Sequence, residues 1–502
     1  MSAPGGALAT DLPGAGTLAA ELLAALVVIA LLTLLMRKRE DAFPLLAVLA
    51  LPFRVPISAD GRTVNLLIPL YLVVAAGALA RLLPRLLGQQ AQPDSQPLPA
   101  PAPPTAPQGE QTPVPDRPRE ESVASPARLS FWTSARGLQW LLFGAVGLYA
   151  LQAIYSADRV KAVENIAFFY VPFGLLFVLL KEVRWTRELL LRCLGVLVAL
   201  AVIFAGVGFI EYFRKSLFLN PKVVAANQYD NYFRVNSLFF DPSIYGRFLA
   251  LVMIAVTTIV VSDDSSSARD AAAAARTRRE VLLCAAVLVW LLGGLVTSFS
   301  QSSIAALLLG LAVLAAWRWG LRGTLYVSGS LLALAALLVL LAPAGLHFGL
   351  KGSGGSTSNA TSGRTTLVSG GLDLFADRPL DGYGSGSFET EYKRRSDTTS
   401  ENATSASHTI PVTVAAEQGV IGLAVYLALL IVAFLVLFRG AGRSPPRIAL
   451  AACFAALVLH TWTYADFLED PFTWALLAIG VALSRQDGRW PARGGVLGRS
   501  RA

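Results

Sequence analysis

Histidine and arginine are the side chains of this sequence with the clearest capacity for chemistry. The three histidines are His347, His408 and His460. A histidine gains or loses a proton near neutral pH and can therefore act as a general base, although an isolated one more often has a structural role. His408 stands out because SHTIPVTVAAEQGVIG, residues 407–422, surrounds it. Arg234 and Arg364 are candidates for holding phosphate, since a guanidinium keeps its charge and can bind two oxygen atoms.

These residue types suit a reaction in which a hydroxyl loses its proton and a phosphate group departs. Arg234 and Arg364 also have simpler interpretations, as an anchor at the membrane interface and as an ion-pair partner in a loop. Arg247 lies four positions into an apolar run, where a charge is costly unless it faces the interior of a helix bundle. It is therefore a further candidate for donor binding. Glu417 either caps the helix that follows it or holds His408.

The acidic and basic clusters of the polar segments do not predict a metal site. Asp373, Asp377 and Asp381 recur every four residues, which is typical of a solvated helix face. Residues 393–395 form a basic cluster that we interpret as a solvated patch, with phosphate contact as the alternative. The three cysteines all lie in apolar runs, so neither a disulfide framework nor a thiolate metal cluster is expected.

The composition indicates a membrane protein. Of 502 residues, 54% are hydrophobic and 15% are charged, and the mean hydropathy is +0.56. Soluble domains have about 25% charged residues, so the chain is not mainly soluble, disordered or collagen-like. The net charge of +9 comes from short basic clusters between apolar runs, which is a pattern of membrane orientation. We therefore expect no nucleic-acid partner.

The apolar runs predict an all-α membrane protein with about 12–13 transmembrane helices and a large extracytoplasmic loop between the late helices. The alternation of basic loops places the N-terminus outside and the C-terminus in the cytoplasm, with His408, Arg364 and Arg234 on the outer side. The expected spans are 18–36, 42–53, 64–83, 137–155, 163–180, 189–210, 244–262, 281–298, 302–317, 324–343, 420–438, 447–464 and 471–484.

Six regions follow from these spans. A Pro- and Gln-rich segment is expected to be a disordered cytoplasmic linker, and two long outer loops are expected to carry function. The regions are N-terminal transmembrane helices over 1–87, the linker over 88–128, a transmembrane core over 129–343 with an outer loop at 211–243, the large extracytoplasmic loop over 344–419, C-terminal transmembrane helices over 420–485 and a basic cytoplasmic tail over 486–502.

Several segments of the sequence resemble the O-antigen ligase and O-antigen polymerase superfamily of bacterial membrane glycosyltransferases, which are GT-C-like. In that family a histidine of the large loop is followed nine residues later by Glu-x-Gly-x-x-Gly, and His408, Glu417, Gly419 and Gly422 have this spacing. Thr409 replaces the usual Asn. The other similar segments are FRVNSLFFDPSIYGRFLAL (233–251), TSFSQSSIAALLLGL (297–311), GRTTLVSGGLDLFADRPLDGYGSGSF (363–388) and FLEDPFTWAL (467–476).

The resemblance implies an enzyme of the bacterial inner membrane that transfers or polymerises glycan on the outer face of that membrane. The donor would be linked to undecaprenyl diphosphate, and the acceptor would be a glycan or a lipid. By resemblance, His408 and Arg364 are catalytic, Arg234 and Arg247 bind the diphosphate, and the reaction is inverting and needs no metal or other cofactor. Glu417 and Gln301 would support the site, although Gln301 stands where the family usually has Arg.

Two questions stay open at the level of the sequence. A ligase passes a finished glycan to a lipid core, a polymerase passes it to another lipid-linked unit, and some members of the family glycosylate proteins. The alternative class is a transporter or flippase of lipid-linked glycan, for which ionisable residues near the middle of the membrane and broken helices in paired halves are typical. Partner proteins of polysaccharide assembly are also compatible with the sequence.

Overall fold

A computed structural model describes residues 15–59, 62–86, 134–218, 227, 233–262, 271–326, 329, 358–396, 407 and 409–486. The described chain is almost entirely helical, which confirms the predicted all-α membrane class. One antiparallel hairpin, β1 (Val55–Ala59) and β2 (Arg62–Leu66), was not predicted. Its strands flank Asp60-Gly61, a dipeptide typical of tight hairpin turns. β1 lies between two apolar runs, and β2 overlaps the beginning of the predicted span 64–83.

The helices of the described residues have the following order along the chain. In order they are α1 (Ala15–Lys38), α2 (Ala42–Ala50), α3 (Ile68–Arg81), α4 (Leu83–Leu86), α6 (Ala135–Gln152), α7 (Arg159–Asn165), the π-helix η1 (Ile166–Tyr170), α8 (Val171–Leu180), α9 (Arg187–Arg214), α11 (Pro242–Ser262), α12 (Ala271–Thr297), α13 (Gln301–Trp319), α15 (Ser358–Asp377), α16 (Phe388–Ser396), α17 (Ile410–Phe438), the 3-10 helix η3 (Ala441–Arg443), α18 (Pro445–Thr463) and α19 (Pro471–Arg485).

Eight described helical segments are long and apolar enough to cross a membrane, and two shorter apolar helices are α3 and α19. Every predicted span before residue 320 and after residue 410 overlaps a helix, although residues 64–66 of the predicted span 64–83 belong to β2 and not to a helix. The predicted span 324–343 lies mostly outside the described residues, as does the predicted linker 88–128. The total of 12–13 crossings therefore stays a prediction, while the multi-pass helical architecture is confirmed.

The centre of the bundle is α18, which packs against α11, α13, α17 and α19. Alanines make this close packing possible, because small residues let helix backbones approach each other; Ala451, Ala452 and Ala456 are all buried. Trp474 of α19 is the largest fully buried side chain. By contrast, the apolar side chains of α1 are mostly exposed, as is expected of a helix whose surroundings are lipid.

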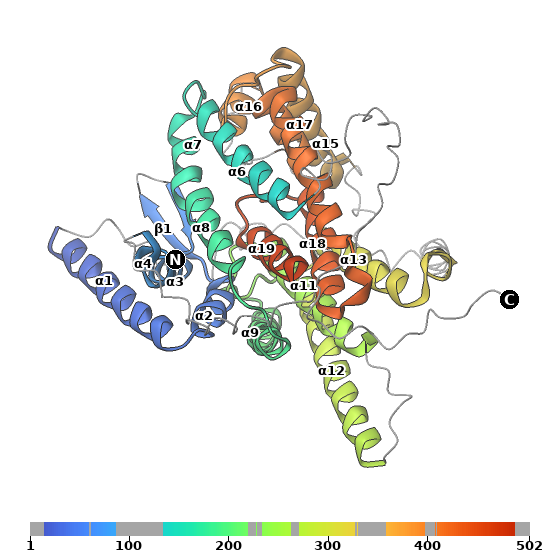
Figure 1. Cartoon of the computed structure of the whole chain (residues 1–502). Coiled ribbons are helices and arrows are strands. Elements are labelled where there is room, and N and C mark those ends of the chain that lie inside the picture. The colour runs from blue at the N-terminus through green and yellow to red at the C-terminus, as the bar shows by residue number, and fades with distance from the viewer. Residues whose placement is uncertain are drawn as a thin grey trace, which may run out of the picture.

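The described residues of the region predicted as the large outer loop contain two helices and the start of a third. In Figure 1, α15 and α16 lie beside the first turns of α17 at one end of the molecule, close to the junction of α6 and α7. The helix predicted near residues 367–375 is part of the longer α15. Gly419 interrupts α17 with a non-helical backbone conformation, one residue before the predicted domain boundary at residue 420. The first turns of α17 thus pack with the loop helices.

Candidate active site

The kink at Gly419 is a docking point for the glycine-rich loop between α15 and α16. Gly419 has φ 65° and ψ −165°, a conformation open essentially to glycine. The free N–H of Val420 donates to the carbonyl of Pro379 at 2.7 Å, and the N–H of Gly384 donates to the carbonyl of Glu417 at 2.8 Å. A Cβ on Gly382 would lie 2.4 Å from the Glu417 backbone. Close backbone contact therefore explains why glycines occupy both segments.

Glu417 fixes the far end of this loop. Its side chain is 8% exposed, and its two carboxylate oxygens accept hydrogen bonds from the N–H groups of Gly386 at 2.9 Å and Phe388 at 3.1 Å. Phe388 is the first residue of α16, so the carboxylate caps α16, where the helix dipole favours negative charge. Capping was one of the two roles expected of Glu417, and the helix that it caps is α16 and not α17. The other expected role, holding His408, involves a residue outside the described part of the chain.

Glu417→Gln is expected to destabilise the loop by about 1–3 kcal/mol, because one amide N–H₂ would face a backbone N–H that now donates to an oxygen. The measurement is limited proteolysis between α15 and α16 together with a thermal melt. Glu389→Gln is the matched control, since Glu389 is 39% exposed and only pairs with Lys393. If Glu417→Gln were as resistant to protease and to heat as Glu389→Gln, this role of Glu417 would be contradicted.

His408 and the Arg364 side chain lie outside the part of the chain that the structure describes, although Arg364 belongs to the α15 segment. The residues beside His408 are described. Ser407 is buried, and its hydroxyl donates to the carbonyl of Thr409 at 2.7 Å. The hydroxyl of Thr409 donates to the carbonyl of Trp462 at 2.7 Å. Thr409, the residue after His408, is thereby attached to the end of α18.

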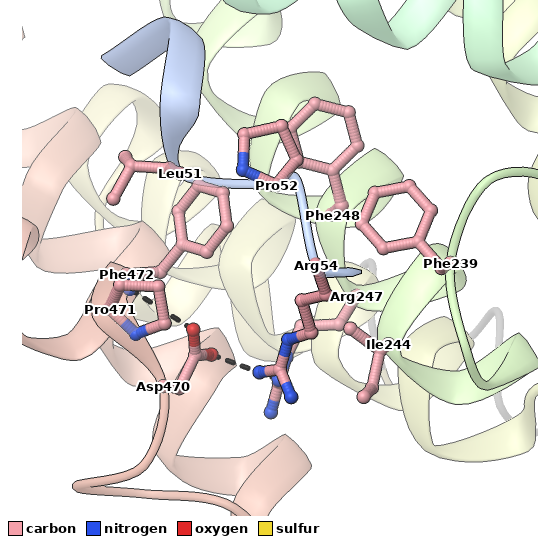
Figure 2. A pocket seen from close by; sticks show the side chains of 10 residues that line it. All are labelled: Leu51, Pro52, Arg54, Phe239, Ile244, Arg247, Phe248, Asp470, Pro471 and Phe472. Carbon is pink, nitrogen blue, oxygen red and sulfur yellow. Dashed lines mark hydrogen bonds and ion pairs between the residues drawn. The ribbon is translucent and has the colours of Figure 1, made fainter. Parts of the chain in front are cut away.

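The loop from α18 to α19 begins two residues after Trp462 and ends in a buried ion pair. Arg247 of α11 lies 3.0 Å from Asp470, and the two side chains are 3% and 2% exposed. Asp470 also accepts a hydrogen bond from the N–H of Phe472 at 3.0 Å, which caps α19. Figure 2 shows this pair at one side of a pocket whose other side is aromatic. Arg247 thus faces the bundle interior.

Arg234 approaches the same region from the chain before α11. Both backbone groups of Arg234 bind the side-chain amide of Asn227, at 3.0 and 2.9 Å. Its half-buried guanidinium donates through Nε to the carbonyl of Ser298 at 3.4 Å. A Cβ on Gly246 would lie 3.0 Å from the Ser298 hydroxyl. Since Gly246 precedes Arg247, both arginines flank the turn from α12 to α13.

The start of α13 contributes a serine cluster that binds His460. Nε2 of His460 lies 3.3 Å from the Ser302 hydroxyl and 3.2 Å from that of Ser303. His460 is fully buried in α18, so these contacts support the structural interpretation of this histidine. Gln301, the first residue of α13, is exposed. Its side chain does not join this buried cluster.

Glu469 lies in the loop between α18 and α19, and the pKa of its carboxyl group is raised. It accepts a hydrogen bond from Nδ2 of Asn165 at 2.9 Å. Burial, reinforced by the negative charge of Asp466, raises the pKa of Glu469 to about 7, although Lys161 and Arg54 oppose the shift. The carboxyl therefore exchanges its proton near neutral pH.

This raised pKa predicts a pH dependence of stability. Between its ordinary pKa of 4.5 and about 7, the Glu469 carboxyl binds more protons in the folded than in the unfolded protein. Its contribution to stability is therefore present at the acidic end of this window and falls as the pH rises. Glu469→Gln is expected to reduce the decrease in melting temperature across the window. An unchanged pH profile in purified Glu469→Gln protein would contradict the assignment.

The fold and this arrangement define a multi-pass membrane protein whose polar groups gather around the ends of α6, α11, α17 and α18. Residues 286–427 match the model of a family described as O-antigen ligase. The match confirms the O-antigen ligase or polymerase type of family that the motifs predict. It includes Gln301, Arg364, His408 and Glu417 and supports an O-antigen-ligase-like glycan transfer. No curated protein gives a significant match to the chain.

Two residues near Arg247 were not among the predicted site residues. Asp470 had a sequence signal, because it belongs to FLEDPFTWAL, which carried part of the family resemblance. Arg54 had none, since it follows a short apolar run far from every motif. The structure places Arg54 in the same pocket as Arg247 and Asp470.

Proposed function

We propose that the protein transfers glycan from a polyprenyl-diphosphate-linked donor to a hydroxyl of an acceptor on the outer face of the bacterial cytoplasmic membrane. The donor is an undecaprenyl diphosphate glycan, and the acceptor is a glycan or a lipid. His408 is the base, Arg364 stabilises the departing diphosphate, and Arg234 and Arg247 hold it. The family match over residues 286–427 is the observation that carries this proposal.

The contacts of the described residues support a common site. Thr409 binds Trp462, and the loop that begins after Trp462 holds Asp470 and its partner Arg247. Arg234 donates a hydrogen bond to the carbonyl of Ser298, and the hydroxyl of Ser298 lies beside Gly246, the residue before Arg247. Thr409, the residue after His408, is therefore connected to Arg247 through the loop from α18 to α19. A histidine and arginines in such a group suit proton removal beside a phosphate.

The proposed reaction uses these groups in one step. His408 accepts the proton of the acceptor hydroxyl, and the oxygen attacks the anomeric carbon of the donor sugar. The bond between that carbon and the diphosphate oxygen breaks, with inversion at the carbon. The arginine charges stabilise the negative charge on the departing lipid diphosphate. The products are the extended or ligated glycan and free polyprenyl diphosphate, and the reaction needs no metal.

Complementation in the native host with His408→Ala tests this function. Long surface glycan is expected to disappear from a gel and lipid-linked precursor to accumulate, provided the variant reaches the membrane at the normal level. Single-repeat products would indicate a polymerase, and full-length glycan left on its lipid carrier would indicate a ligase. An unchanged glycan profile would contradict the role of His408 and favour the transporter or flippase.

A further inference from the structure

Arg54 gives the pocket of Arg247 a second guanidinium group. Arg54 lies between α2 and β1 and lines the pocket together with Arg247 and Asp470. In Figure 2 the aromatic rings occupy one side of this pocket, and the arginines and Asp470 occupy the other. The remaining lining is apolar and consists of Leu51, Pro52, Phe239, Ile244, Phe248, Pro471 and Phe472.

The charges of this pocket are not balanced pairwise. Asp470 pairs with Arg247 at 3.0 Å. Burial raises the pKa of both Asp470 and Glu469, and the nearby positive charge of Arg54 opposes both shifts. No hydrogen bond or ion pair joins Arg54 to another residue that the structure describes. A half-buried guanidinium is costly unless an acceptor satisfies its N–H groups. The pocket therefore has a positive group available for an anion.

We propose that Arg54 binds a phosphate group of the lipid-linked donor beside Arg247, with Asp470 positioning Arg247. This inference rests on the proposed function and extends the donor site to the N-terminal part of the chain. A guanidinium binds two phosphate oxygens in parallel. The apolar walls, including Phe239, Phe248 and Phe472, suit the prenyl chain that continues from the phosphate.

The size of the cavity adds a condition to this binding. Its volume is about 10 Å³, which is the space of one water molecule. A phosphate group is larger, so binding requires some of the lining residues to move apart.

The test is the binding of undecaprenyl diphosphate to the purified full-length protein in phosphatidylcholine nanodiscs. Arg54→Gln is expected to raise the Kd about tenfold or more, since hydrogen bonds to charged groups are the strong ones. Arg54→Lys is expected to bind more weakly than wild type and more tightly than Arg54→Gln, because it keeps the charge and loses the planar fork. Arg39→Gln is the matched control, as Arg39 is exposed in the same part of the chain.

Each outcome separates this inference from the proposed function. If wild type binds the lipid and both Arg54 variants bind with the same Kd, the inference is overturned and the proposed function stands. If wild type binds no undecaprenyl diphosphate, the proposed function itself is contradicted. If Arg54→Gln fails to fold, Arg54→Lys decides, and a wild-type Kd for it overturns the inference. Binding of phosphatidylglycerol is measured in the same way. If Arg54→Gln weakens the binding of phosphatidylglycerol as much as that of undecaprenyl diphosphate, Arg54 binds bilayer phospholipid and the inference is overturned.

Discussion

Replacing Asp470 with Asn is expected to lower the free energy of unfolding by about 3–5 kcal/mol, because removing one member of a buried ion pair leaves the other charge without compensation. Arg247 would be that charge, since its side chain is 3% exposed. Asn has nearly the same shape as Asp and can still cap α19 through Phe472. The loss therefore reports mainly the charge. It is measured by denaturant unfolding of the purified protein in mixed micelles.

The matched control is Asp377→Asn. Asp377 forms an ion pair with Arg395, and both side chains are more than 40% exposed, at 45% and 43%. Exposed pairs contribute less than about 1 kcal/mol, so this variant is expected to unfold almost like wild type. The double variant Arg247→Met, Asp470→Leu is expected to regain stability but not glycan transfer. A double variant with full activity would show that Arg247 only stabilises the fold.

Gly419→Ala is expected to abolish glycan transfer, because it would separate the glycine-rich loop from α17. The backbone conformation alone costs an alanine roughly 1–3 kcal/mol. In addition, the new Cβ would lie 2.2 Å from the carbonyl oxygen of Leu380, and neither backbone can yield without breaking the contacts at Pro379 and Gly384. Transfer activity and proteolysis of residues 378–388 measure the effect.

Gly195→Ala is the control for this substitution. Gly195 lies inside α9, and a Cβ there meets no atom within 4 Å. Alanine is favoured over glycine in helix interiors by about 1 kcal/mol, so no loss is expected. A Gly419→Ala variant as active and as protected from protease as Gly195→Ala would contradict the proposed importance of the kink.

Much of the helical framework could be predicted from the sequence. Long apolar runs predict membrane helices because every backbone polar group in a bilayer has to be satisfied within its own element. The hairpin from Val55 to Leu66 could not be predicted in this way, because its strands are short and the second one overlaps the beginning of an apolar run. The kink at Gly419 had a sequence signal in the Glu-x-Gly pattern, but its contact with Pro379 did not, because that contact depends on how α15 folds back.

The candidate site was predictable to a similar extent. Arg247 stood out as a charge inside an apolar run, a sign that it faces other protein groups. Its partner could not be derived, because Asp470 lies on a distant segment and many acidic residues were equally possible. The sequence left two roles open for Glu417, and neither of them predicted its hydrogen bonds with Gly386 and Phe388. The position of Arg54 beside Arg247 could not be predicted, because it is seen only in the folded pocket.

The most direct test of glycan transfer is a reaction with purified components. The full-length protein in nanodiscs would receive an undecaprenyl-diphosphate-linked glycan and an acceptor glycan or lipid. Wild type is expected to form the joined product and release undecaprenyl diphosphate in equal amounts, while His408→Ala binds the donor but forms no product. Product formation by His408→Ala at the wild-type rate, or no product from folded wild type with any acceptor, would contradict the proposed function.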